Sequence, residues 1–139
     1  VVLNKGSKDN IKLGMAIMDN TYLVGKIVEV NYLSSRALLL ADLNSKIPVS
    51  IEPQGIQAIM SGSGEDHGII QYSKKVIIDN SVEELIVLTS GAGGIFKSGI
   101  PIGKLKKSVD SANKKQVEFY SDFSQLKYVK IKSFKKIEN

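Results

Sequence analysis

Short apolar stretches of strand length recur along the whole chain, and polar or glycine-containing turns separate them. Tyr22–Val30 alternates apolar and polar residues, Ala37–Ala41 is a continuous apolar run, and Tyr128–Lys132 alternates again. Runs rich in Val, Ile and Leu between turn residues are typical of β-strands. About ten to twelve such runs at a spacing of roughly 8–12 residues, without a convincing helical period, predict an all-β protein, either a sandwich or a barrel.

The chain has 139 residues, enough for one domain or two very small ones. A weak internal similarity between Leu23–Ile27 and Pro101–Leu105 favours two units, although chance similarity between short strands is the alternative. We therefore predict two small β-barrels of about six strands each, side by side, with very little helix. We place the first barrel at residues 1–80 and the second at residues 81–139, and we expect that the N-terminal strand can pair with the second barrel.

The composition is that of an ordinary globular protein, with 42% hydrophobic and 24% charged residues. Absence of Cys excludes disulfides and thiolate metal sites. The charge is uneven: residues 1–96 carry 8 basic and 10 acidic side chains (−2), whereas residues 97–139 carry 11 Lys and 4 acids (+7). This asymmetry indicates either contact with a nucleic acid or an anionic surface, or lysines that solvate strand faces.

Thr89–Gly103 holds five of the twelve glycines of the chain. Its part Gly91–Ser98 matches the phosphate-loop pattern G-x-x-x-x-G-K-[ST] except at Phe96, where the motif needs glycine. A phosphate loop also needs a helix directly afterwards, whereas Gly99–Pro101 follows here. We therefore interpret the glycines as serving backbone geometry. The glycines to which we assign this structural role are Gly25, Gly91, Gly93, Gly94, Gly99 and Gly103.

Catalytic and metal-binding patterns are missing from the sequence. The single histidine, His67, lies four residues after Ser63 in a polar loop, whereas a hydrolytic triad converges from separate parts of a fold. The sequence has neither an H-E-x-x-H motif nor EF-hand spacing. We therefore predict a protein that is not an enzyme and that needs no cofactor or metal; a β-barrel hydrolase is a less favoured alternative.

A nucleic-acid-binding barrel of the OB type is the main alternative function. Tyr128 shares a strand face with Lys130 and Lys132, as an aromatic stacking platform would require. Against this, arginine, a preferred partner of phosphates and bases, occurs once, at Arg36. We therefore expect no nucleic-acid partner.

Seven motifs, in order along nearly the whole chain, resemble the extracytoplasmic β-region of the bacterial rod shape-determining protein family MreC. The motifs are Lys5–Ser7, Leu13–Ile17, Leu23–Ile27, Ser35–Asp42, Thr89–Phe96, Gly99–Gly103 and Asp122–Leu126. The stretch from Thr89 to Gly103 is the most specific of them. The family often has proline directly after the phenylalanine, where this chain has Lys97.

The resemblance implies a non-catalytic scaffold of the cell-elongation machinery, outside the cytoplasmic membrane. Family members carry an N-terminal transmembrane anchor and a coiled coil before two small β-barrels; this chain begins with Val1 and would lack both. The implied partners are a class B penicillin-binding protein, MreD and the MreB system. The resemblance also implies self-association, as a dimer or a filament.

Such a scaffold would bind partners through strand edges and exposed apolar side chains. The candidate interface residues are Ile95, Phe96, Tyr120 and Tyr128. For Phe96 we favour a place in the core, because a glycine loop commonly turns one large side chain inward.

Overall fold

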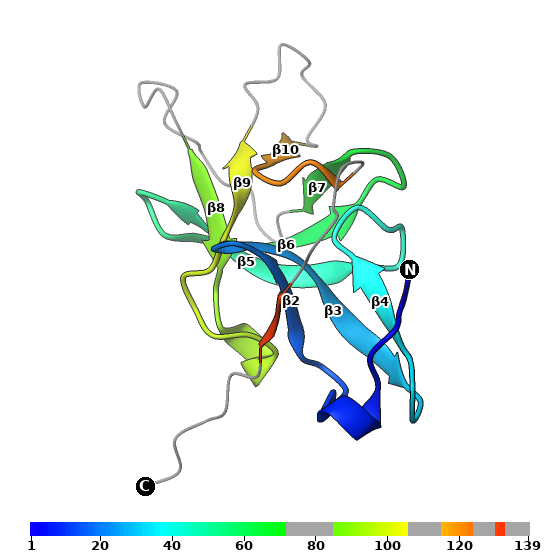
Figure 1. Ribbon diagram of the computed structural model, residues 1–139. Helices are drawn as coiled ribbons and strands as arrows, with labels where there is room; N and C mark the ends of the chain where they lie inside the picture. Colours follow the sequence, from blue (N-terminus) through cyan, green and yellow to red (C-terminus); the bar gives the residue numbers. More distant parts are fainter. Residues whose placement is uncertain (72–84, 106–114, 124–129, 133–139) are drawn as a thin grey trace, which may run out of the picture.

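A computed structural model describes residues 1–71, 85–105, 115–123 and 130–132 of the chain (Figure 1). Within these ranges the secondary structure is almost entirely β, which confirms the predicted fold class with very little helix. The strands are β1 (Val2–Leu3), β2 (Ala16–Asp19), β3 (Tyr22–Val30), β4 (Ser35–Leu39), β5 (Lys46–Glu52), β6 (Ile56–Gly62), β7 (His67–Gln71), β8 (Ile86–Thr89), β9 (Pro101–Leu105), β10 (Lys115–Phe119) and β11 (Lys130–Lys132). Two single 3-10 turns, η1 (Ser7–Asp9) and η2 (Ala92–Gly94), complete the described elements.

The four N-terminal strands and β11 form a five-stranded antiparallel sheet in the order β1-β4-β3-β2-β11. A two-residue turn joins β2 to β3, where Asp19 pairs with Tyr22 and Asn20 has φ 54°. Asparagine tolerates this left-handed conformation because its short side chain can bond locally. The sheet buries residues on both faces, since neighbouring positions of β3 such as Leu23 and Val24 are both fully buried.

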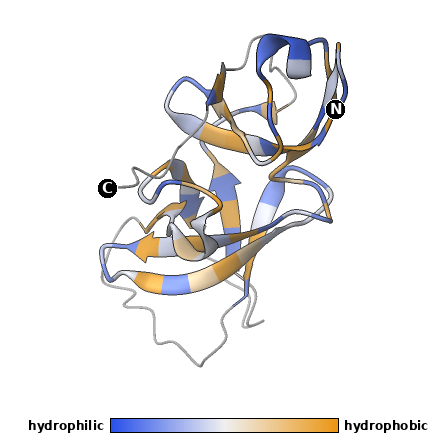
Figure 2. Ribbon diagram, turned by 90° about the horizontal axis from the view of Figure 1, so that it is seen from below, coloured by the Kyte–Doolittle hydropathy of each residue, from blue (hydrophilic) through white to orange (hydrophobic). Residues whose placement is uncertain are grey.

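The remaining six strands close into a barrel in the order β10-β7-β6-β5-β8-β9. β5 illustrates the pattern: Ile47, Val49 and Ile51 are buried inside the barrel and alternate with more polar or outward residues. Figure 2 shows this alternation as orange and blue or pale bands along the strands. Closure leaves the barrel without an unpaired edge.

The strand pairing differs from the predicted division at residue 80. β5, β6 and β7 join β8, β9 and β10 in one barrel, through the pairs β5–β8 and β7–β10, and not the N-terminal sheet. The N-terminal strand β1 stays in its own sheet, and it is the late strand β11 that returns across the molecule to pair with β2. Two groups of three strands would each leave two open edges, and joining them into one barrel removes all four. Among the described residues, the N-terminal unit is an open five-stranded sheet.

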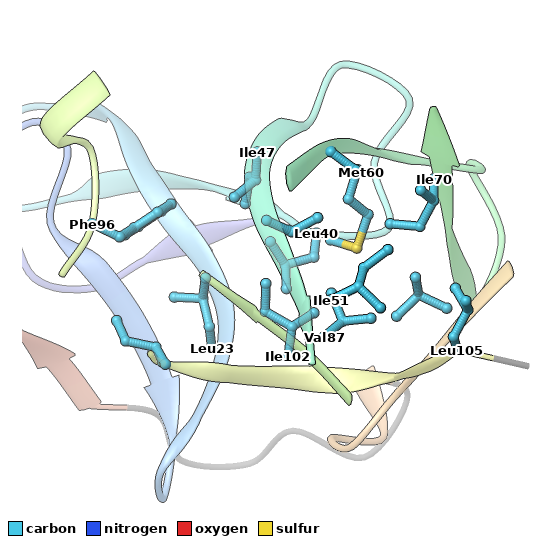
Figure 3. Packing of buried hydrophobic residues seen from close by; sticks show 14 of the residues in the cluster. Leu23, Leu40, Ile47, Ile51, Met60, Ile70, Val87, Phe96, Ile102 and Leu105 are labelled. Carbon is cyan, nitrogen blue, oxygen red and sulfur yellow. The ribbon is translucent and has the colours of Figure 1, made fainter. Parts of the chain in front are cut away.

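One continuous core connects the barrel to the N-terminal sheet. The cluster contains Ala16, Met18 and Leu23 from the sheet together with the buried side chains of the barrel. Figure 3 shows Leu23 of β3 in the same cluster as Phe96 and as Ile102 of β9. A smaller second cluster, built around Ile17, Val24, Ile27 and Ala37, lies within the sheet itself.

Two phenylalanines strengthen the junction between the two units. The rings of Phe119 and Phe123 stack with centroids 4.9 Å apart and an interplanar angle of 9°. Phe123 packs against both hydrophobic clusters. Because apolar contacts cross the junction, the sheet and the barrel form one packed body.

Candidate functional site

The connection between β8 and β9, residues 90–99, is called the glycine loop here. Thr89 closes its base with four hydrogen bonds. The Thr89 hydroxyl Oγ1 donates to the Lys97 carbonyl oxygen at 2.6 Å and accepts the Ile100 N–H at 2.9 Å. The Thr89 backbone accepts the Gly99 N–H at 2.8 Å and donates to the Ile100 carbonyl at 3.0 Å. Thr89 is 2% exposed, and its hydroxyl bond with the Ile100 N–H is buried. Sequence reasoning did not single out this residue, although it begins the most specific motif.

The glycine loop needs its glycines for backbone conformation. Positive φ values occur at Gly91 (76°), Gly93 (72°), Gly94 (66°) and Gly99 (88°). L-residues with a Cβ rarely adopt this region, so a side chain at these positions would strain the loop. The loop leads into β9 and not into a helix, and the arrangement that a phosphate loop requires is therefore absent from this stretch.

The two glycines of the internal similarity occupy equivalent positions, where strands approach closely. A Cβ added to Gly25 in β3 would lie 2.5 Å from the Leu38 carbonyl oxygen of β4. A Cβ added to Gly103 in β9 would lie 2.2 Å from the Glu118 carbonyl oxygen of β10. Both contacts are shorter than any real Cβ contact, so each unit requires a glycine at this point of its sheet.

The structure separates the two neighbouring candidates at the tip of the glycine loop. Phe96 is 6% exposed and belongs to the main core, where it is not available to a partner. Ile95 is 41% exposed, next to the exposed residues Ala92–Gly94. The glycine loop is thus anchored inward by Phe96 and presents Ile95 on the surface.

Tyr120 lies directly after β10, at the junction of the barrel and the N-terminal sheet. It is 39% exposed, and its ring packs 5.0 Å from the ring of Tyr22 at the start of β3, tilted by 34°. Sequence reasoning missed Tyr22, because the pair forms only through tertiary contact. Tyr128, the fourth candidate, lies outside the residues that the structure describes.

The loop between β6 and β7 holds three consecutive residues with metal-ligating atoms. One such atom from each of Glu65, Asp66 and His67 lies within 4.8 Å of the others. His67 Nδ1 is 3.1 Å from Asp66 Oδ1, and both acids are exposed. Exposed neighbouring acids commonly occur without an ion, so this group alone does not indicate a metal centre.

In the described ranges, no helix is long and apolar enough to cross a membrane.

Comparison with known proteins identifies the family of this chain. The family described as "Rod shape-determining protein MreC, barrel core" matches residues 1–133. Cell shape-determining protein MreC of Cereibacter sphaeroides is 31% identical over 131 residues, which are 94% of this chain and 42% of that protein. MreC of Caulobacter vibrioides is 34% identical over 130 residues, 94% of this chain and 36% of that protein. The chain thus spans less than half the length of these relatives.

Solved structures agree with this assignment. A structure described as MreC superposes with a TM-score of 0.79 at 26% identity, covering 94% of this chain and 76% of that one. A complex between the penicillin-binding protein PBP2 and MreC from Helicobacter pylori matches at 20% identity with a TM-score of 0.56, over 78% of this chain and 67% of that chain. The second likeness concerns the fold alone. With a family match over nearly its whole length, the chain belongs to the rod shape-determining MreC family.

Proposed function

We propose that this chain is the partner-binding part of a non-catalytic scaffold for the cell-elongation machinery, working outside the cytoplasmic membrane to organise peptidoglycan synthesis and maintain rod shape. The observation that carries this proposal is the family match over residues 1–133. The relatives it matches are cell shape-determining proteins. The OB-like nucleic-acid alternative has no support among these relatives.

The packing of the chain supports a scaffold role in physical terms. A scaffold must hold its binding surfaces in a constant relative orientation, because partners that meet on it would otherwise gain little from being tethered. Here the main core runs from the barrel into the N-terminal sheet, and the Tyr22–Tyr120 pair adds a contact at the surface of the junction. The shared core therefore holds the surfaces of the barrel and of the N-terminal sheet in a fixed relative orientation.

We propose a class B penicillin-binding protein as the principal partner. The MreC of Helicobacter pylori has been captured in complex with PBP2, which supports this choice. MreD, the MreB system and a second copy of the chain, as a dimer or filament, are further proposed partners. In the full-length protein, an N-terminal membrane anchor would hold the scaffold at the cytoplasmic membrane.

We propose Ile95 and Tyr120 as partner contacts, because both present apolar area at the surface. Buried aromatic and aliphatic anchors commonly supply most of the binding free energy of an interface. Replacing either side chain by Ala should weaken binding of the penicillin-binding protein by about tenfold, the effect of roughly 1.4 kcal/mol. Leu43→Ala is the matched control, because Leu43 is 69% exposed in the loop between β4 and β5.

The test measures binding of the purified chain to the extracytoplasmic part of the organism's class B penicillin-binding protein by surface plasmon resonance. Rod shape of cells that carry the same variants in the full-length protein is the second readout. Equal affinities for wild type, Ile95→Ala and Tyr120→Ala would refute these contacts. Absence of any binding by the wild type would refute the proposed partner. Tight oligonucleotide binding that falls steeply with salt would favour the nucleic-acid alternative.

A further inference from the structure

One end of the N-terminal sheet carries exposed apolar side chains among lysines, a surface we call the lysine tip. It consists of Lys5, Lys8, Lys12, Leu13, Tyr32 and Leu33. Its three apolar side chains are among the most exposed large hydrophobic residues that the structure describes, at 67% for Leu13, 66% for Tyr32 and 62% for Leu33. All three lysines are exposed as well. Tyr32 and Leu33 are neighbours in the chain, and a contiguous exposed apolar patch commonly marks a binding surface.

Backbone hydrogen bonds bring the segment that carries Lys5 and Lys8 onto the connection that carries Tyr32 and Leu33. The turn η1 lies along the connection between β3 and β4, where the Ser7 N–H donates to the Asn31 carbonyl at 2.9 Å and the Lys8 N–H to the Tyr32 carbonyl at 3.0 Å. The segment then folds back, since the Ile11 N–H donates to the Gly6 carbonyl at 3.2 Å, and it continues beside β3, where the Gly14 N–H donates to the Ile27 carbonyl at 2.9 Å. Figure 1 shows these segments, drawn in blue and light blue, together at the end of the sheet that faces away from the barrel.

Gly6 makes this arrangement possible. A Cβ at Gly6 would lie 2.2 Å from the Asn31 carbonyl oxygen and 2.6 Å from the Ser34 nitrogen. Only glycine therefore allows the N-terminal segment to contact the turn between β3 and β4 this closely. The three lysines and Leu13 lie on the N-terminal segment, and Tyr32 and Leu33 lie on the turn that this segment contacts.

The charge of the lysine tip is positive. Residues 4–14 contain three lysines and one aspartate, and residues 30–35 contain no charged residue, so the two segments together carry +3 − 1 = +2. The aspartate, Asp9, accepts a hydrogen bond from the Gly6 N–H at 3.4 Å and so has a local role. The nearest acid on β3, Glu29, forms an ion pair with Arg36 at 3.2 Å. The net positive charge of the lysine tip favours a partner of negative charge.

We propose that the lysine tip docks on the surface of an anionic lipid bilayer. Tyrosine and leucine enter the boundary between headgroups and acyl chains, and lysines bind lipid phosphates while their aliphatic stems remain against apolar surface. A protein partner fits this composition less well, because lysine is depleted in protein–protein interfaces. This proposal does not depend on the proposed scaffold function. Its test uses vesicles made of lipid alone, so the result does not require any protein partner.

Sedimentation with lipid vesicles tests the charge of the lysine tip. The full chain should bind vesicles of phosphatidylethanolamine and phosphatidylglycerol at low salt, and much less well vesicles of phosphatidylcholine. Each lysine near an anionic surface contributes about fivefold in binding, so Lys5→Gln, Lys8→Gln and Lys12→Gln together should lower the partition coefficient roughly a hundredfold. The matched control makes the same charge change on exposed lysines of β5, the glycine loop and β9, with Lys46→Gln, Lys97→Gln and Lys104→Gln. Equal losses in the two triple variants would overturn the proposal.

A tryptophan reporter tests which residues enter the bilayer. The chain has no Trp, so Tyr32→Trp provides a single fluorophore at the lysine tip, and Leu43→Trp provides one at a similarly exposed position beyond the opposite end of β4. On binding, lipids brominated in the acyl chains should quench Trp at position 32 and leave Trp at position 43 unquenched. Quenching of position 43 alone, or of neither, would overturn the proposal. So would tip variants that retain vesicle binding while losing a protein partner.

Discussion

Phe96→Ala tests whether the glycine loop is held by an inward anchor. Phe96 is 6% exposed in the cluster that joins the barrel to the N-terminal sheet. Removing its ring therefore leaves a cavity inside the core. Truncating a buried Phe to Ala generally costs about 3–5 kcal/mol, from lost transfer free energy and from the cavity that remains. The free energy of unfolding should fall by that amount.

The expected change in melting temperature follows from chain length. An unfolding entropy of about 2.1 cal/mol/K per residue gives about 290 cal/mol/K for the 139-residue chain, so the Tm should fall by about 10–17 °C. Ile95→Ala, one position away and 41% exposed, should lower the Tm by less than about 3 °C.

Differential scanning calorimetry, supported by urea unfolding followed by circular dichroism, measures both variants. If Phe96→Ala fails to fold, Phe96→Leu provides the same comparison with a smaller loss of about 1–1.5 kcal/mol. A Tm for Phe96→Ala within 3 °C of wild type, combined with weakened partner binding, would contradict the assignment to the core.

Three further predictions concern the loop base, the strand contacts and the surface. Thr89→Val should lower the free energy of unfolding by about 2–4 kcal/mol, because the Lys97 carbonyl and the Ile100 N–H lose their hydroxyl partner. Thr89→Ser should cost less than about 1 kcal/mol, and equal losses for the two variants in urea titrations would contradict this. Gly103→Ala should cost about 3 kcal/mol in thermal unfolding, because its Cβ would meet the Glu118 carbonyl of β10; an unchanged Tm would show that the strands can separate freely. A double-mutant cycle on Arg36 and Glu29 should give a coupling below about 1 kcal/mol, since both side chains are about half exposed or more, at 61% and 49%; stronger coupling would mean that the pair is more shielded than its exposure indicates.

Much of the local structure follows from the sequence alone. Alternating runs such as Tyr22–Val30 predict strands, because successive side chains of a strand point to opposite faces. The departure at Phe96 from the phosphate-loop pattern is enough to predict a corner in place of a ligand site, and the ordered motifs identify the family. The inward position of Phe96 follows from the need of a glycine-rich loop for one apolar anchor.

Only the tertiary structure decides which strands pair and which exposed residues meet. A period of two specifies the faces of a strand but not its neighbour, so the sequence does not indicate that β7 pairs with β10 or that β11 returns to β2. The Tyr22–Tyr120 contact joins residues almost a hundred positions apart in the chain. The lysine tip likewise exists only because η1 folds onto the turn after β3. The local pattern is equally compatible with several strand pairings. The observed pairing is the one that closes the open strand edges of the barrel and buries the shared core, and both of these depend on the whole chain.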